Sequence, residues 1–176
     1  MAEARRPRRA SRDTPPPAAS RVLARVQGRA NEPLLLLHFA FRAVTRGPDA
    51  LLSRHGFGRL HHRVLFFVGR DPDVRVGDLQ VALGISKQAL HLPLRELVEA
   101  NLVESTPDVD DARSRRLRLT DAGKTLEDSL SGAQRKLFRA AFRRAGREAT
   151  DGWRQVMAEL AREIAPGKLA DEEPLP

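Results

Sequence analysis

One predicted helix near the middle of the sequence carries polar side chains whose types suit hydrogen bonding to nucleic-acid bases and phosphates. A glutamine amide can make two hydrogen bonds to adenine, and lysine or arginine can reach guanine or the backbone. The residues concerned are Ser86, Lys87, Gln88, His91 and Arg95. The same residue types also form ordinary solvated helix surfaces, so these side chains taken alone leave both interpretations open.

Two short helices joined by a tight turn would hold this polar face in place. Apolar residues recur at helical spacing between Val76 and Leu83, and Gly84 with Ile85 supplies the turn. Ser86 is a typical N-cap for the second helix, which runs to about Ala100. This pattern is typical of a helix-turn-helix. The inward side of the second helix is predicted to hold Ala89, Leu90, Leu94, Leu97 and Val98.

A turn-rich hairpin with a basic tip follows the second helix. Residues 102–105 and 115–119 have the composition of short strands, and residues 107–114 join them. A hairpin of this kind beside a helix-turn-helix is a wing. Arg115 and Arg116 begin its second strand, where they either bind phosphates or remain solvated strand residues.

Longer helices flank this segment, and their apolar stripes exceed what one small subunit can cover. They are predicted at residues 31–47 with a continuation at 50–54, at 59–68, at 120–145 and at 150–164, with Asn31, Thr120 and Thr150 as N-caps. The excess predicts contact with a second copy of the chain, and core packing within the monomer is the alternative. The predicted interface residues are Leu34, Leu37, Leu137, Trp153, Met157 and Leu160.

The chain has 176 residues and no cysteine, which excludes disulfides, thiolate metal sites and cysteine nucleophiles. Of its net charge of +8, most lies in residues 1–30, where eight arginines stand against Glu3 and Asp13. This proline-containing segment is expected to be a disordered basic tail, either a phosphate-binding extension or an inert leader.

No glycine-rich phosphate loop and no nucleophile beside a base occurs, so neither an enzyme nor a cofactor is expected. The neighbours His61 and His62 would point about 100° apart on a helix, so no metal site is expected. The longest apolar run, residues 34–41, is far shorter than the roughly 18 residues of a membrane span.

The segment from Val64 to Gly123 resembles the MarR family of transcriptional regulators. The resemblance rests on a leucine-rich helix followed by Asn101-Leu102-Val103, on Asp111-Ala112-Arg113 in the wing, and on Leu119-Thr120-Asp121-Ala122-Gly123. It implies a mainly α fold with a small two-stranded β wing: a winged helix-turn-helix with flanking dimerisation helices. It also implies that Arg113 enters the minor groove of DNA and that Asp111 orients it.

The resemblance further implies a sensor cleft for small aromatic or anionic molecules, between the dimer helices and the DNA-binding lobe. The residues that would line it are His38, Phe41, Phe57, His62 and Phe66. The alternative is that these aromatic rings belong to the core and that the histidines are partly exposed.

Three residues depart from the family pattern. Asn101 stands in place of a glycine, which is tolerable because asparagine also adopts the left-handed conformation of a helix end. Pro93 lies inside the recognition helix, where it removes one backbone hydrogen bond and should bend the helix. Leu92 occupies a position that is often polar, where it would either contact a thymine methyl or pack inward.

These patterns, taken together with the family resemblance, predict a cytoplasmic, nucleoid-associated bacterial homodimer that binds double-stranded DNA at a pseudo-palindromic operator, and the resemblance implies that it is a ligand-responsive repressor. The alternative is a winged-helix module that binds protein without specific DNA binding. The predicted organisation is a tail at 1–30, an N-terminal dimerisation region at 31–57, the DNA-binding lobe at 58–120, C-terminal dimerisation helices at 121–165 and a disordered tail at 166–176.

Overall fold

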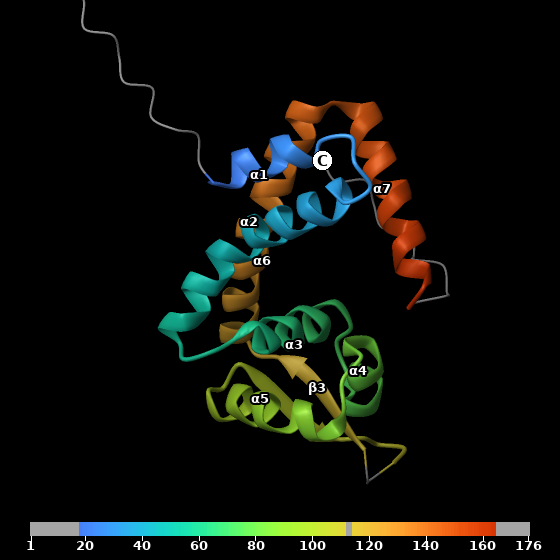
Figure 1. Ribbon diagram of the computed structural model, residues 1–176. Helices are drawn as coiled ribbons and strands as arrows, with labels where there is room; N and C mark the ends of the chain where they lie inside the picture. Colours follow the sequence, from blue (N-terminus) through green and yellow to red (C-terminus); the bar gives the residue numbers. More distant parts are fainter. Residues whose placement is uncertain (1–17, 112–113, 165–176) are drawn as a thin grey trace, which may run out of the picture. The chain divides into compact units, whose positions relative to one another are not determined.

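The computed structural model describes residues 18–111 and 114–164. Its contacts divide the chain inside helix α2 into two compact units, residues 1–43 and 44–176. Figure 1 shows the elements coloured along the sequence. They are α1 (Ala18–Val26), α2 (Glu32–Arg54), α3 (Arg59–Arg70), β1 (Val74–Arg75), α4 (Val76–Leu83), α5 (Lys87–Glu99), β2 (Val103–Pro107), β3 (Arg115–Leu119), α6 (Asp121–Ala145) and α7 (Arg147–Arg162).

Helix α1 corrects the expectation that residues 1–30 lack structure. Residues 18–26 are helical, and Leu23 and Val26 are half-buried beside the exposed Val22. These three apolar residues follow helical spacing, which is enough to make one side of a short helix apolar. The predictions for residues 1–17 and 166–176 lie outside the described residues.

Helix α2 is continuous, whereas an interruption at Pro48-Asp49 was predicted. Pro48 lies inside the helix and is buried, and Leu52 one turn later is 1% exposed. A proline costs the helix one backbone hydrogen bond, and burial of its ring offsets that loss here. A Cβ on the preceding Gly47 would contact that of Ala133, so this half of α2 packs on α6.

The strands of the second unit form an antiparallel sheet in the order β1-β3-β2. The two wing strands pair as predicted, from Val103 opposite Leu119 to Pro107 opposite Arg115. The third strand, β1, was not predicted, and it pairs Val74 with Leu117. Two residues are too few to show the alternation by which a strand is detected in sequence.

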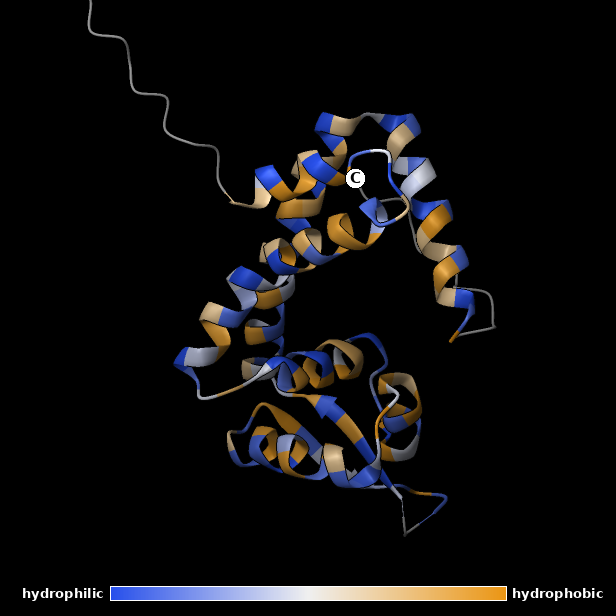
Figure 2. Ribbon diagram, viewed as in Figure 1, coloured by the Kyte–Doolittle hydropathy of each residue, from blue (hydrophilic) through white to orange (hydrophobic). Residues whose placement is uncertain are grey.

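The core of the second unit lies between the helix-turn-helix, the sheet and α6. Leu65 of α3, Leu79 of α4, Leu117 of β3 and Leu130 of α6 are each fully buried. Figure 2 shows the helices of this lobe striped with hydrophobic and hydrophilic residues, as helices with one buried side must be. The predicted fold class, a mainly α winged helix-turn-helix, is confirmed.

Helix α6 begins against the end of the recognition segment. The Thr120 hydroxyl donates to the carbonyl oxygen of Asn101 (2.7 Å) and accepts from the N–H of Gly123 (3.0 Å). A Cβ at Gly123 would lie 2.0 Å from the carbonyl oxygen of Leu102, so only glycine fits there. The segment from Leu119 to Gly123 therefore locks α6 to the α5–β2 turn, and Thr120 is the N-cap that was predicted.

The cap of the last helix differs from the prediction. Helix α7 starts at Arg147 after Gly146, which has φ 87°, and Thr150 lies inside the helix with its hydroxyl donating to the carbonyl of Gly146 (2.8 Å). A threonine four residues into a helix can make this backward bond, so its sequence signal is ambiguous. None of the helices among the described residues is long and apolar enough to span a membrane.

Candidate nucleic-acid interface

The turn between α4 and α5 fixes where the recognition helix begins. Gly84 adopts the left-handed conformation with φ 63° and ends α4. Arg63 of α3 donates to the carbonyl oxygen of Leu83 (2.7 Å), which satisfies an acceptor at that helix end. The Ser86 hydroxyl oxygen accepts from the backbone N–H of Ala89 (3.2 Å), so Ser86 is the predicted N-cap of α5.

Helix α5 has one buried side and one exposed polar side. Leu90 and Leu97 are 1% and 0% exposed, and they anchor the helix in the lobe. The four predicted contact residues of this helix are all exposed: Lys87, Gln88, His91 and Arg95. Arg95 pairs with Glu99 (3.4 Å). Among the described residues, the other three make no side-chain hydrogen bond or ion pair, so they are available to an external partner.

The buried side of α5 is narrower than predicted. Ala89 and Val98 are exposed, although both were expected to face inward. Each lies about 100° around the helix from a fully buried leucine, which is far enough to reach solvent. Leu92, for which two orientations were open, is 50% exposed and points away from the core.

A buried histidine ties the recognition helix to α3. Nε2 of His61 lies 2.7 Å from Oε2 of Glu96, and Nδ1 accepts from the N–H of Gly58 (3.0 Å). Because Nδ1 is an acceptor, Nε2 carries the hydrogen that is donated to Glu96. His61 is only 8% exposed. The pair is separated by 35 positions in sequence, so no local pattern could reveal it.

The buried carboxylate of Asp108 ties the wing at its base. Its Oδ2 atom lies 2.6 Å from Nε of Arg75 and 3.0 Å from Nε of Arg116, and its Oδ1 accepts from the N–H of Asp110 (2.9 Å). The hydrogen bond from Asp110 and those from the two arginines lower the pKa of Asp108 to about 2, against the opposing effect of burial. Asp108 and Arg75 were not among the predicted functional residues.

The predicted DNA-contacting residues of the wing differ in whether they already have a polar partner within the chain. Arg116 is held by Asp108, and Arg115 donates from Nε to the Ser105 hydroxyl (2.6 Å). Asp111 is exposed. Arg113 lies outside the described residues. An arginine that is bonded within the chain must break that bond before it binds a phosphate. The exposed side of α5 is therefore a better candidate for the DNA-reading surface than the arginines of β3.

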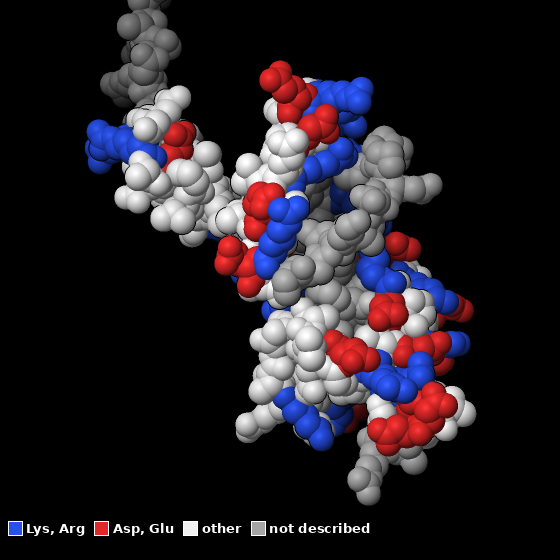
Figure 3. All heavy atoms as spheres, turned by 90° about the vertical axis from the view of Figure 1, so that its right-hand side faces the viewer, with Lys and Arg blue, Asp and Glu red and all other residues white. Residues whose placement is uncertain are grey.

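Acidic and basic groups alternate on this lobe. Arg118 forms two hydrogen bonds with Asp73, and this contact lowers the pKa of the Asp73 carboxyl. On the face drawn in Figure 3, blue and red side chains lie beside one another. The lobe therefore offers separate cationic groups for phosphates rather than one continuous basic patch.

Two of the predicted cleft residues, His38 and Phe41, belong to the first unit, where both are exposed. The other three belong to the second unit. Phe66 is 36% exposed, and the guanidinium of Arg70 lies 4.4 Å from its ring centroid. This cation–π contact gives Phe66 a structural partner of its own.

Phe57 and His62 are more enclosed. The Phe57 ring stacks on His61 with 4.8 Å between centroids and on His55 with 6.1 Å. His62 is half-buried, and burial lowers the pKa of its ring, partly opposed by Glu127 and Asp49. Its buried Nε2 atom has no hydrogen-bond partner among the described residues.

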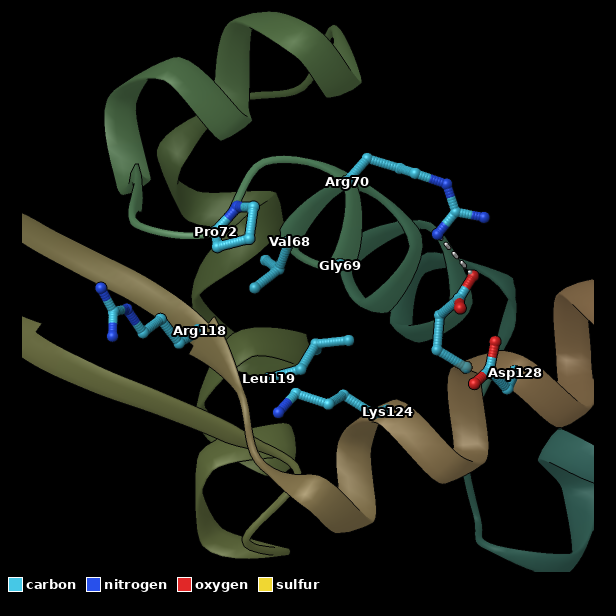
Figure 4. A pocket seen from close by; sticks show the side chains of 9 residues that line it. Val68, Gly69, Arg70, Pro72, Arg118, Leu119, Lys124 and Asp128 are labelled. Atoms are coloured by element: carbon cyan, nitrogen blue, oxygen red, sulfur yellow. Dashed lines mark hydrogen bonds and ion pairs between the residues drawn. The ribbon is translucent and has the colours of Figure 1, made fainter. Parts of the chain in front are cut away.

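A cavity of about 550 Å³ opens at the junction of α3, β3 and α6, and Figure 4 shows its lining. None of the predicted cleft residues lines it. Its charged side chains are already paired, as in Arg70–Glu127 at 3.3 Å and Lys124–Asp121 at 2.9 Å. The lining residues are Val68, Gly69, Arg70, Pro72, Arg118, Leu119, Lys124, Glu127 and Asp128.

The predicted interface residues retain much exposed apolar surface. Leu34 and Leu37 of α2 are 66% and 55% exposed, and Leu160 of α7 is 57% exposed. Trp153 packs on Phe138 and Phe142 of α6 yet stays 40% exposed. Leu137 is also exposed, and Met157 is half-buried.

Comparison with known proteins agrees with this geometry. A model of the MarR family matches residues 55–114, which include the helix-turn-helix. The HTH-type transcriptional regulator PetP of Rhodobacter capsulatus is 41% identical over 148 residues, covering 84% of this chain and 89% of PetP.

Solved structures share the fold. The crystal structure of MarR superposes with a TM-score of 0.63 at 19% identity, covering 74% of this chain and 89% of that one. NadR in complex with 4-hydroxyphenylacetate superposes with a TM-score of 0.61 at 23% identity, covering 72% and 89%. Together with the identity to PetP over most of both chains and the exposed polar face of α5, this shows that the chain belongs to the MarR family of DNA-binding transcriptional regulators.

Proposed function

We propose that the chain is a ligand-responsive repressor that binds a pseudo-palindromic operator as a homodimer. The observation that carries the proposal is the outer face of α5, where Lys87, Gln88 and His91 are exposed and, among the described residues, make no internal polar contact. A helix anchored by buried leucines on one side and polar on the other has the shape and chemistry of a major-groove reader.

Within this proposal Gln88 and Arg95 address base edges, and Lys87, His91 and Ser86 address bases or phosphates at the start of the helix. Arg113 enters the adjacent minor groove and Asp111 orients it, an assignment that comes from the family resemblance. Arg115 and Arg116 support the wing and reach phosphates only by exchanging internal partners.

The dimer would use the exposed apolar residues of α2, α6 and α7. Leucines left more than half exposed, such as Leu34 and Leu160, are costly in a monomer and are covered when two copies meet. Two-fold symmetry then repeats each DNA contact in two half-sites about one helical turn apart.

The proposed effector is a small aromatic or anionic molecule. His62 supports this part of the proposal, because its buried Nε2 is unpartnered among the described residues and would gain a hydrogen bond from such a molecule once a local movement exposes it. Aromatic carboxylates should then raise the melting temperature of the protein and weaken its binding to the operator. A cytoplasmic location at the nucleoid follows from the chromosomal target.

Duplex selection tests the proposal. The full-length protein is incubated with random-sequence duplex DNA, bound molecules are amplified over several rounds, and the selected sequences are footprinted. The proposal expects a symmetric sequence protected by two chains. Recovery of random sequence only, at low as well as at physiological salt, would support the protein-interaction module instead.

A further inference from the structure

We propose that Leu92 is a specificity-determining residue that contacts the 5-methyl group of a thymine in each half-site. The inference rests on the proposed operator binding and adds a residue and a base to it. Leu92 is 50% exposed in the middle of the recognition helix. It is followed by Pro93, which is half-buried.

The position of Leu92 on the helix places it at the edge of the polar face, next to Gln88. At 3.6 residues per turn it lies about 40° from Gln88 and about 60° from Arg95, and about 200° from the buried Leu90. Both Gln88 and Arg95 lie to the same side of Leu92, so an apolar side chain borders two side chains that can hydrogen bond to base edges. Thymine is the base that offers a methyl group to such a side chain in the major groove.

The core of the lobe does not need Leu92. Leu90 and Leu97 fill the inward side of α5, and the half-buried Leu94 packs against the same cluster. Leu92 is absent from that cluster and makes no contribution to it. A leucine side chain that stays in water contributes no hydrophobic free energy. Contact with a methyl group is favourable, because it removes apolar surface of both partners from water.

The experiment removes the methyl group from the DNA and the side chain from the protein in turn. A duplex selected by the full-length protein is synthesised with each thymidine replaced singly by deoxyuridine, which deletes only the 5-methyl group. The native protein should lose affinity about fourfold at one symmetric thymine position per half-site, the factor that corresponds to ~0.8 kcal/mol for one buried methyl group. Leu92→Ala should bind the unmodified duplex more weakly and show no further loss at that position.

Two variants serve as controls. Val81→Ala, which shortens an 82% exposed side chain on α4, should keep the native deoxyuridine profile. Leu92→Met keeps an apolar side chain and should retain the methyl effect. That result would show that the apolar contact, and not a change in folding, is responsible for the loss in Leu92→Ala. Failure to select any sequence would overturn the proposed function. A selected sequence with no methyl effect, or with one that persists in Leu92→Ala, would overturn this inference alone and leave Leu92 a solvent-exposed residue.

Discussion

Nε of Arg75 lies 2.6 Å from Oδ2 of Asp108, so the strand that precedes the helix-turn-helix is bound to the base of the wing. The same carboxylate contacts Arg116 at 3.0 Å and is completely enclosed by its surroundings. One acidic group thus connects β1, the wing loop and β3. This arrangement fixes the direction in which the wing leaves the lobe.

The Asp108 contacts predict a specific loss of stability in acid. The pKa of Asp108 in the folded chain is about 2, below its ordinary 3.8, so its stabilising effect is complete above 3.8 and disappears as the pH falls from 3.8 to about 2. Asp108→Asn should lower the urea midpoint at neutral pH and flatten the fall of the native midpoint in that acid range. Asp110→Asn is the matched control, because its carboxylate is exposed and 3.7 to 3.9 Å from the arginines. Equal acid sensitivity of the native chain and Asp108→Asn would contradict the assignment.

The His61–Glu96 pair predicts that a residue outside the DNA face positions the recognition helix. His61→Ala would remove the partner of the Gly58 N–H and of the Glu96 carboxylate, and because both groups reach solvent, the cost is about 0.5–1.5 kcal/mol for each hydrogen bond lost. Urea unfolding should show this loss, and affinity for the selected duplex should fall under conditions where the variant is folded. His55→Ala, at an exposed position, removes only the 6.1 Å stacking contact with Phe57 and should cost less stability than His61→Ala. If both variants unfold at the native midpoint, the pair does not stabilise α5.

Local patterns predicted the elements of the helix-turn-helix, the wing hairpin and the longer helices, but not α1 or β1, and the long-range contacts escaped prediction. The caps at Ser86 and Thr120 were predictable because a capping hydroxyl and the backbone N–H that donates to it lie three residues apart. Asn101 was expected to tolerate the left-handed conformation, and it has φ 54°. The partners of Asp108 lie 33 and 8 positions away, and nothing in the local sequence distinguishes such an aspartate from a turn residue. The arc of α5 that is buried depends likewise on how the helix is rotated against α3, so Ala89 and Val98 were placed on the wrong side.

Two substitutions on α5 should separate base reading from phosphate binding. Gln88→Ala should cost about 1–3 kcal/mol at one base position per half-site and relax the choice of base there. Lys87→Ala, if Lys87 binds a phosphate, should weaken binding to every duplex and reduce the log–log salt slope by about 0.9 for each phosphate that is no longer neutralised. Fluorescence anisotropy titrations over a range of salt on base-substituted duplexes measure both effects. Identical profiles for the two variants would mean that α5 does not read the groove in this orientation.

The assignment of Arg113 to the minor groove is testable on DNA flanks. Arg113→Ala should weaken binding on all sequences, and most where the flanks are A·T-rich, because a narrow minor groove concentrates negative potential. Arg115→Ala is the comparison, since the Arg115 guanidinium donates to Ser105 inside the chain. Affinity measured on duplexes with A·T and G·C flanks distinguishes the two variants. Unchanged affinity of Arg113→Ala on both duplexes would remove the wing from the interface.

The apolar stripe of α7 predicts where the dimer can be broken. Leu160 lies seven residues after Trp153, about 20° away around the helix, so both belong to one exposed apolar side. Leu160→Glu places a charge in that surface, and because the leucine is 57% exposed in the single chain, the subunit fold should persist. Sedimentation at micromolar concentration should show one chain instead of two, with unchanged helical circular dichroism and weaker binding to a full operator. Gln155→Glu adds the same charge about 200° from Trp153, on the opposite side of α7, and should remain dimeric. A dimer that survives Leu160→Glu with native affinity for DNA would show that α7 lies outside the interface.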